Sequence, residues 1–298
     1  MVSADSEDHK GSVAIIGCGI MGTGIAQVCL ASGYRVHLYG RSSDSCVKAK
    51  DQLRKNLVKS ATKKRGEDAN TMDIQKAVDT QMAHLDLCSD IRSAVTAADY
   101  VIEAVVEKKS VKDDVFAEAQ RYCPSHAILI TNTSSIKLSD MLSSIQEHSR
   151  FAGLHFFNPV PLMKLVEVVS TPETSEETQA RLMQFCQSLG KRPVSCKDTP
   201  GFIVNRLLVP YLLDSIRMLE RGDATKEDID AAMCYGTSCP MGPLTLCDYV
   251  GLDTIANVMS VWRESMPEDA RFTQIPLLEK LVAEGKLGRK TKQGFYKY

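Results

Sequence analysis

The stretch Ser12-Val-Ala-Ile-Ile-Gly17-Cys-Gly19-Ile-Met-Gly22 decides the fold of this chain. Its apolar first half predicts a buried strand, and the pattern G-x-G-x-x-G follows directly, before a helix predicted over Gly24–Ala31. The three glycines permit a tight turn and let a pyrophosphate approach the helix N-terminus, where free N–H groups and the helix dipole favour anions. Placed between a strand and a helix, the pattern predicts a dinucleotide-binding unit, with Gly17, Gly19 and Gly22 as cofactor-binding residues.

The second predicted strand, Tyr34–Tyr39, ends without the acid that is usual in NAD-binding units. That acid normally accepts a hydrogen bond from the ribose 2′-hydroxyl. Here Gly40-Arg41-Ser42-Ser43 follows the strand, and Arg41 with the two serines is suited to a 2′-phosphate. We therefore expect NAD as the cofactor, with NADP used at least as well. The alternative is that Arg41 is merely solvated and the adenosine is held less tightly.

A long helix predicted over residues 44–65 has one basic face. Its apolar residues and its lysines each recur at every fourth position, on opposite sides: Leu53, Leu57, Ala61 and Lys55, Lys59, Lys63. Eight Lys or Arg lie between Lys48 and Arg65, against one acid, Asp51. Such a face is either only solvated or holds a polyanion such as the phosphates of coenzyme A. With a second helix over Thr71–Met82, it forms a helical excursion over residues 44–83.

Two further strands bring polar residues to one edge of the predicted sheet. Residues 100–106 end at Glu107 and lead into a helix that contains Lys112, and residues 127–131 lead to Ser134. Open α/β sheets bind ligands beyond the carboxyl ends of their strands, so Glu107 and Ser134 are candidate site residues. A plain N-cap or turn role for Ser134 is an equal alternative.

Two short apolar runs, Phe151–Phe157 and Leu162–Val169, are joined by the turn formers Asn158-Pro-Val-Pro161. They predict a pair of adjacent strands. If the strands fold back on each other, His155 and Glu167 face across the turn, and a carboxylate that holds an imidazole is the basic arrangement of a proton-transfer site. The alternative is a structural histidine with an incidental surface glutamate.

From residue 198 onward the sequence is helical with no clear strand, so we place a domain boundary at 197/198. The predicted organisation is α/β, a Rossmann-like, mostly parallel sheet domain over 11–197, followed by an all-α domain over 198–298. Its helices are predicted to open at Thr199-Pro200 and to lie near 225–235, 244–261 and 274–285. Asn205 stands among apolar residues, where its amide either bonds a neighbouring backbone group or contacts a substrate.

Composition excludes several classes of partner. The net charge is −1, with 36 Lys and Arg against 37 Asp and Glu, which gives no reason to expect nucleic acid or an anionic membrane. No apolar run approaches the length of about 20 residues that spans a bilayer. The ten cysteines show no metal-type spacing and are interpreted as reduced, mostly buried thiols, with no metal site.

Several motifs occur together and in order along nearly the whole chain. They are residues 17–22, 132–135, 150–161, 164–168, 197–206, 240–243 and 288–296. With them the chain resembles the 3-hydroxyacyl-CoA dehydrogenases of fatty-acid β-oxidation, in their short-chain, single-function animal form. The resemblance implies a two-domain enzyme that oxidises (S)-3-hydroxyacyl-CoA to 3-ketoacyl-CoA and dimerises through its helical domain.

The resemblance also implies roles for residues at matching positions. His155 matches the general base and Glu167 its partner, while Ser134, Asn158 and Asn205 match residues that hold the reacting oxygen and the thioester end. Cofactor contacts are implied for Glu107, Lys112 and Lys290, and also for Ser134 and Asn158. Contacts with CoA are implied for Lys63, Ser134 and Asn56, although the family often has Ser where Asn56 stands.

Gly40-Arg41 departs from the family, which has Asp at the end of the second strand, so the departure bears on coenzyme choice. Family members of this form work in the mitochondrial matrix. Residues 1–10 contain three acids and no Arg, which is typical of neither a transit peptide nor a secretory signal, so a cytoplasmic location is the alternative. Two other functions remain open: a crystallin-like 3-hydroxyacid dehydrogenase without a CoA site, and a non-enzymatic binding protein on the same fold.

Overall fold

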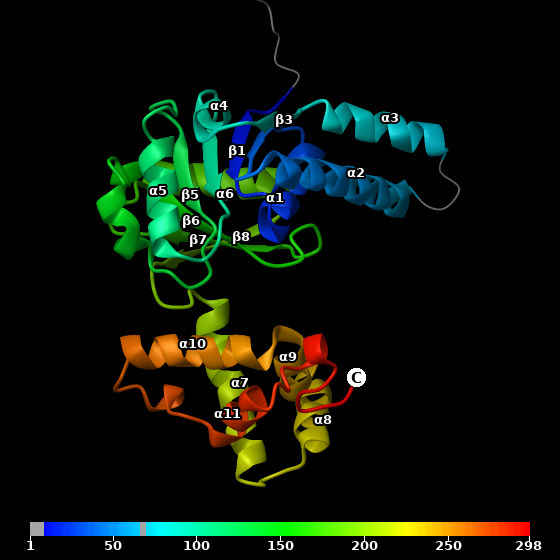
Figure 1. The fold of residues 1–298 in the computed structure, drawn as a ribbon, viewed down its shortest axis with the longest axis vertical. Coiled ribbons are helices and arrows are strands. Elements are labelled where there is room, and N and C mark those ends of the chain that lie inside the picture. Colours follow the sequence, from blue (N-terminus) through cyan, green and yellow to red (C-terminus); the bar gives the residue numbers. More distant parts are fainter. Residues whose placement is uncertain (1–8, 66–69) are drawn as a thin grey trace, which may run out of the picture. The chain divides into compact units, whose positions relative to one another are not determined.

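The computed structural model describes residues 9–65 and 70–298, and the chain forms two compact units, each described here by itself (Figure 1). The first unit ends at Phe202 and the second runs from Ile203 to Tyr298. The division falls after Phe202 rather than at 197/198 because the intervening residues are tied to the first unit. The Asp198 carboxylate accepts hydrogen bonds from the backbone N–H groups of Leu138 and Ser139, and Phe202 packs into that unit's core. Residues 1–8, on which the expectation about a transit peptide or secretory signal largely rests, lie outside the described residues.

The first unit is built on an eight-stranded sheet in the order β3-β2-β1-β4-β5-β6-β7-β8. The strands are β1 (Ser12–Ile16), β2 (Arg35–Tyr39), β3 (Leu85–Cys88), β4 (Tyr100–Glu103), β5 (Ile128–Thr131), β6 (Phe151–Phe156), β7 (Leu165–Ser170) and β8 (Arg192–Lys197). The pairing of β6 with β7 is antiparallel, and every other pairing between these strands is parallel. The carboxyl ends of β1 to β6 therefore meet at one edge of the sheet, which we call the carboxyl edge.

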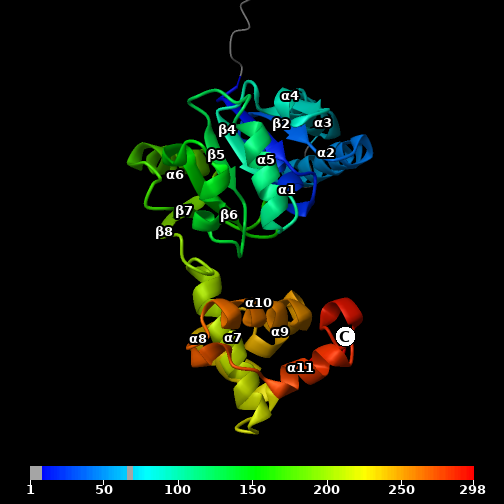
Figure 2. The same ribbon diagram turned by 60° about the vertical axis from the view of Figure 1, so that its left-hand side comes forward.

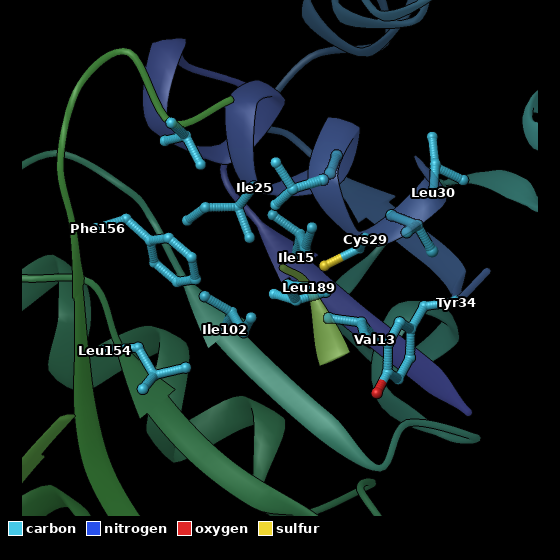
Figure 3. Packing of buried hydrophobic residues seen from close by; sticks show 14 of the residues in the cluster. Val13, Ile15, Ile25, Cys29, Leu30, Tyr34, Ile102, Leu154, Phe156 and Leu189 are labelled. Carbon is cyan, nitrogen blue, oxygen red and sulfur yellow. The ribbon is translucent and has the colours of Figure 1, made fainter. Parts of the chain in front are cut away.

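Helices cover both faces of this sheet. They are α1 (Ile20–Ala31), α2 (Ser43–Arg65), α3 (Thr71–Met82), α4 (Ile91–Val95), α5 (Lys109–Ala119) and α6 (Glu176–Ser188). Val13 and Ile15 of β1 pack into the core shared with α1, α2, α3 and α6, whereas Ala14 and Ile16 face the core shared with α4 and α5. Figure 3 shows the first of these cores, where Ile25 and Cys29 of α1 lie over Val13 and Ile15. A strand that is apolar on both faces is typical of a parallel sheet covered by helices.

The predicted α/β organisation is confirmed, and the helical excursion appears as α2 and α3. The strand β3 and the short helix α4 were not predicted. In their segment, Leu85–Val95, apolar and polar residues alternate only weakly and over a short length, so the sequence lacks a strong periodic signal. The strand predicted over 100–106 is shorter than expected, because Val105 donates its backbone N–H to the side chain of Glu103 instead of to a neighbouring strand.

The second unit is all helical (Figure 2). Its α-helices are α7 (Val204–Glu220), α8 (Lys226–Thr237), α9 (Pro243–Val250), α10 (Leu252–Ser265) and α11 (Pro276–Ala283). The helix start predicted at Thr199-Pro200 is wrong, because Gly201 and Phe202 have φ angles of 78° and 51° and α7 begins only at Val204. The helix predicted over 244–261 is two helices, since Gly251, at φ 105°, interrupts the backbone between α9 and α10.

A buried aspartate fastens the chain's last residues to the helical unit. The carboxylate of Asp248 on α9 accepts backbone hydrogen bonds from Phe295 and Tyr296, both at 2.9 Å, and one from the Tyr298 hydroxyl at 3.0 Å. Gly294 lies so close that a Cβ there would overlap the same carboxylate. The glycine and aromatic residues of the closing stretch therefore serve this packing.

Within the described residues, no helix combines the length and the apolar character that crossing a bilayer requires. All ten cysteines are free thiols. The part of the chain that the structure describes holds no group of His, Cys, Asp and Glu side chains arranged to bind a metal ion.

Candidate active site

The glycine-rich loop lies at the carboxyl edge between β1 and α1, where it is shaped to receive a pyrophosphate. Gly17 has a φ of 130°, and a Cβ there would overlap the carbonyl oxygen of Ala104. A Cβ on Gly22 would overlap the carbonyl oxygen of Gly17, so α1 can approach the end of β1 this closely only because residue 22 is glycine. Gly19 is the N-cap of α1 and faces open space, with nothing within 4 Å of the position of a Cβ. These features fit a dinucleotide whose phosphates lie against the helix N-terminus.

The histidine and glutamate of the hairpin form a buried pair. His155 on β6 stands directly opposite Glu167 on β7, and its Nδ1 lies 2.6 Å from Glu167 Oε2. Glu167 has no exposed surface, and the His155 side chain is 8 % exposed. The rings of Phe157 and Phe202 lie 4.4 and 5.5 Å from the imidazole ring. The structure thus confirms that the two residues face each other, and it rejects the alternative of an incidental surface glutamate.

This pairing fixes what the imidazole can do. When Nδ1 donates its hydrogen to the carboxylate, Nε2 carries the lone pair and acts as the proton acceptor. Among the described residues, the hydrogen bond of the His155 ring is made by Nδ1, which leaves Nε2 available to a bound molecule. The buried carboxylate also stabilises the imidazolium that forms when Nε2 takes a proton.

Glu107 organises the loop that follows β5. Its Oε1 accepts hydrogen bonds from the Thr133 hydroxyl and from the backbone N–H groups of Ser134 and Ser135, at 2.5, 2.9 and 3.0 Å. Burial favours the neutral acid, but the charge of Lys112 and these hydrogen bonds outweigh it and lower the pKa of Glu107 to about 2. The loop that presents Ser134 is therefore held by a carboxylate that stays ionised.

Lys112, which the resemblance places at the cofactor, is buried under this edge with 1 % of its side chain exposed. Its ammonium lies 2.8 Å from Glu103 Oε1 and 3.1 Å from Glu107 Oε2. Thr131 donates its hydroxyl hydrogen to the other oxygen of Glu103 at 2.8 Å. This position favours a positioning role, in which Lys112 links the end of β4 to Glu107, over a direct contact with the cofactor.

Replacing Lys112 with Met tests this role. The change leaves the fully buried Glu103 carboxylate without its cation, and we expect a loss of roughly 3–5 kcal/mol in the free energy of unfolding. Urea unfolding of the two proteins measures the loss. The double variant Lys112→Met/Glu103→Gln should recover much of it, because it removes the buried charge as well. A loss of less than about 1 kcal/mol in the single variant would contradict the buried-pair interpretation.

The Glu107 pKa predicts a pH-dependent stability. Because its folded-state pKa of about 2 lies below the ordinary value of 4.5, ionised Glu107 stabilises the fold above about pH 4.5, and this contribution is lost as the pH falls toward 2. Glu107→Gln should therefore be less stable than the parent at pH 7, and the difference should shrink at pH 3. Urea unfolding at both pH values checks this, and a difference that grows on acidification would overturn it.

The remaining candidates of the first unit lie at the same edge but make fewer contacts. Ser134 and Asn158 are both exposed, Ser134 in the loop after β5 and Asn158 in the turn after β6. By topology the edge thus collects the glycine loop, Glu107, Ser134, His155 and Asn158. Asn205 and Lys290 belong to the second unit, Asn205 in the first turn of α7 and Lys290 paired with Asp253 at 2.5 Å.

The basic helix has the two faces that the sequence predicts. Leu53 and Leu57 of α2 are buried in the core, and Lys63 is exposed. Asn56 accepts a hydrogen bond from Gln52 on the same helix at 2.8 Å, and Arg54 pairs with Asp79 on α3. The side chains of residues 64 and 65, which add to the basic count, lie outside the described residues.

Sequence reasoning missed Glu103 and Thr133 as parts of this site. The only signal for Glu103 was an ionisable residue inside a strongly apolar strand, where a charge requires a partner. Thr133 belongs to the segment after β5 that was noted for Ser134, but its bond to Glu107 joins positions 26 residues apart. Short-range spacing carries no information about such a contact.

Comparisons with known proteins agree with this arrangement. The family model "3-hydroxyacyl-CoA dehydrogenase, NAD binding domain" matches residues 12–199, and "3-hydroxyacyl-CoA dehydrogenase, C-terminal domain" matches residues 201–298. Hydroxyacyl-coenzyme A dehydrogenase, mitochondrial, of Rattus norvegicus is 48% identical over 96% of this chain and 90% of its own length. The 3-hydroxybutyryl-CoA dehydrogenase of Clostridioides difficile is 40% identical over 96% of this chain and 99% of its own length.

A solved structure shares the architecture as well. The crystal structure of (S)-3-hydroxybutyryl-CoA dehydrogenase from Ralstonia eutropha has a TM-score of 0.89 and 34% sequence identity, covering 96% of this chain and 98% of that one. The two family models together span nearly all of the chain from residue 12 to its last residue. The chain therefore belongs to the 3-hydroxyacyl-CoA dehydrogenase family, an oxidoreductase family whose first domain binds NAD.

Proposed function

We propose that this chain oxidises the 3-hydroxyl group of an (S)-3-hydroxyacyl-CoA to the 3-keto group, or catalyses the reverse reduction, with NAD as cofactor. The observation that carries the proposal is the buried pair of His155 and Glu167 at the carboxyl edge that also holds the glycine-rich loop. Oxidation of a secondary alcohol needs a group that removes the hydroxyl proton and an acceptor for the hydride. The His155–Glu167 pair supplies the group that removes the proton, and the nicotinamide, when bound, supplies the hydride acceptor.

His155 takes the hydroxyl proton on Nε2, while Glu167 holds the imidazole in the required tautomer. We assign Ser134 and Asn158 to hydrogen bonds with the reacting oxygen, whose charge changes most during the reaction. Asn205 is assigned to the thioester end of the substrate. Glu107 keeps the Ser134 loop in place and therefore acts through that loop.

Coenzyme A is assigned to the basic face of α2, with Lys63 and Asn56 as contact residues. Its phosphates are anionic, and the exposed lysines of this face form a field that attracts them. This basic face also distinguishes between two candidate functions. A dehydrogenase of free 3-hydroxyacids has no need of it, whereas a CoA-dependent enzyme does.

The decisive assay compares acetoacetyl-CoA with free acetoacetate as substrates for reduction by NADH. We expect the CoA thioester to be used with a much higher kcat/KM than the free acid. Lys63→Ala should raise KM for the thioester and leave kcat nearly unchanged, since the charge is remote from the reacting carbon. Preference for the free acid would instead support the 3-hydroxyacid dehydrogenase, and no turnover of either would support a binding protein.

We also infer that the chain forms a homodimer through its helical unit. Several large apolar side chains of that unit are exposed: Leu207, Tyr235, Tyr249 and Val261. Exposed apolar surface of this kind is typical of subunit interfaces. Sedimentation velocity should give twice the mass of the chain, and a monomer at micromolar concentration would contradict this inference.

We place the protein in the mitochondrial matrix, by analogy with the relative from Rattus norvegicus, whose name carries the word mitochondrial. A fluorescent protein fused to the carboxyl end of the full chain should coincide with a matrix marker in living cells. A diffuse cytoplasmic signal would favour the alternative location.

A further inference from the structure

The carboxyl end of β2 is built so that no side chain fits at position 40. A Cβ placed on Gly40 would lie 2.6 Å from Cys18 Sγ, 2.8 Å from Ser45 Oγ and 3.1 Å from Cys18 Cβ. All three distances are shorter than ordinary van der Waals contact. An acidic residue here, which would accept the hydrogen bond of the ribose 2′-hydroxyl, requires Cys18 to move.

Cys18 is itself held in place by a second thiol. Its Sγ lies 3.4 Å from Sγ of Cys46 on α2, and Cys46 is buried. Burial and the neighbouring Cys46 thiol raise the pKa of Cys18 to about 12, so Cys18 stays neutral. The Cys18 sulfur atom of the glycine-rich loop and the Ser45 hydroxyl of α2 thus fill the space that the acid would need.

Arg41 follows this packed position and has no ion-pair partner among the residues that the structure describes. It is exposed, as are Ser42 and Ser43 beside it. Ser42 accepts the backbone hydrogen bond of Ser45 at 3.2 Å and thereby opens α2, a helix of 23 residues. The one acid of this segment is Asp44, in the first turn of α2 and also exposed.

We propose that the adenosine subsite of this chain accepts a 2′-phosphate, with Arg41 as the residue that determines this specificity. The protein then binds NADP(H) as well as NAD(H). The proposal deepens the proposed function, since it rests on the same dinucleotide site. Removal of the acid abolishes the repulsion that excludes a 2′-phosphate, and an unpaired guanidinium is the side chain best shaped to hold phosphate oxygens.

The test measures binding of adenosine fragments by calorimetry, so it does not depend on catalysis. The ligands are 5′-AMP and adenosine 2′,5′-bisphosphate, which differ only by the 2′-phosphate. The parent protein should bind the bisphosphate at least as tightly as 5′-AMP. Arg41→Ala should weaken the bisphosphate about tenfold or more and leave 5′-AMP nearly unchanged, because only the 2′-phosphate loses a charge-assisted hydrogen bond.

The matched control is Arg121→Ala. Arg121 is also exposed, but it follows the end of α5 just before β5 begins, which places it at the opposite edge of the sheet. The same loss of one positive charge there should change neither affinity. An equal loss in both arginine variants would show only a general charge effect and would overturn the proposal.

A double variant tests whether the packing around Gly40 is what excludes an acid. Cys18→Ala/Gly40→Asp removes the blocking sulfur and restores an acid, so it should weaken the bisphosphate and retain 5′-AMP. If this variant does not fold, the Arg41 measurement still decides, since Arg41 is exposed and unpaired. Parent protein that binds 5′-AMP more than tenfold tighter than the bisphosphate refutes the proposal, even when NAD-dependent turnover of the thioester is normal.

Discussion

Replacing His155 with Gln is expected to lower kcat by a factor of about 10²–10⁴ while the affinity for NADH stays unchanged. Glutamine is polar and close in size, but its side chain cannot take up the hydroxyl proton at neutral pH. Glu167 has no exposed surface, so it cannot reach a bound hydroxyl in place of the imidazole. Steady-state kinetics with acetoacetyl-CoA measures kcat, and fluorescence titration measures the affinity for NADH.

A second histidine provides the control for this experiment. His126 also pairs with a carboxylate, since its Nε2 lies 3.0 Å from Asp99 Oδ1, but its side chain is 58% exposed. It stands before the start of β5, away from the carboxyl edge. His126→Gln should leave kcat nearly unchanged. Turnover within a few fold of the parent in His155→Gln would show that His155 is not the base.

Replacing Glu167 with Gln is expected to lower kcat by about 10² or more with little change in the KM for the thioester. The amide keeps the shape but loses the charge, so the imidazolium formed during oxidation is no longer stabilised, and the amide can favour the wrong tautomer. In hydrolases that orient a histidine through a buried carboxylate, the corresponding change costs about 10⁴ in kcat. Glu167 contacts His155 and not the reacting atoms, so we describe it as a positioning residue that acts through the imidazole.

Two further measurements distinguish this positioning role from a purely structural one. Urea unfolding shows whether the variant is folded under assay conditions. Glu167→Asp should retain more of the parental kcat than Glu167→Gln, because the aspartate keeps the charge that stabilises the imidazolium. A Glu167→Gln protein that is stably folded and retains parental kcat would rule out the role.

Local patterns predicted most of the framework. The apolar run before G-x-G-x-x-G becomes β1, the loop lies where the pattern predicts, and the hairpin brings His155 opposite Glu167. These features depend on residues close in sequence, where period, turn formers and spacing act directly on the backbone. The helix predicted near 225–235 likewise begins where expected, because the Thr225 side chain accepts a hydrogen bond from the backbone N–H of Asp228 at the start of α8.

Other expectations failed where backbone conformation overrides local preference. Thr199-Pro200 has the sequence of a helix start, but the positive φ angles of Gly201 and Phe202 delay α7 to Val204. A continuous apolar pattern through 244–261 likewise conceals the break at Gly251. The periodicity of apolar residues predicts which face of a helix is buried. It does not predict where a single residue with an unusual φ angle interrupts the backbone hydrogen bonds.

The sequence by itself determined the α/β class, the dinucleotide loop, the basic face of α2 and the hairpin in which His155 can face Glu167. Only the tertiary structure decided that Lys112 lies buried between Glu103 and Glu107, and that Cys18 and Ser45 occupy the space beside Gly40. The reason is the range of the contacts. Periodicity and turn chemistry act over a few residues, whereas Cys18 meets Cys46 across 28 positions, and such contacts exist only after the sheet has brought its carboxyl ends together.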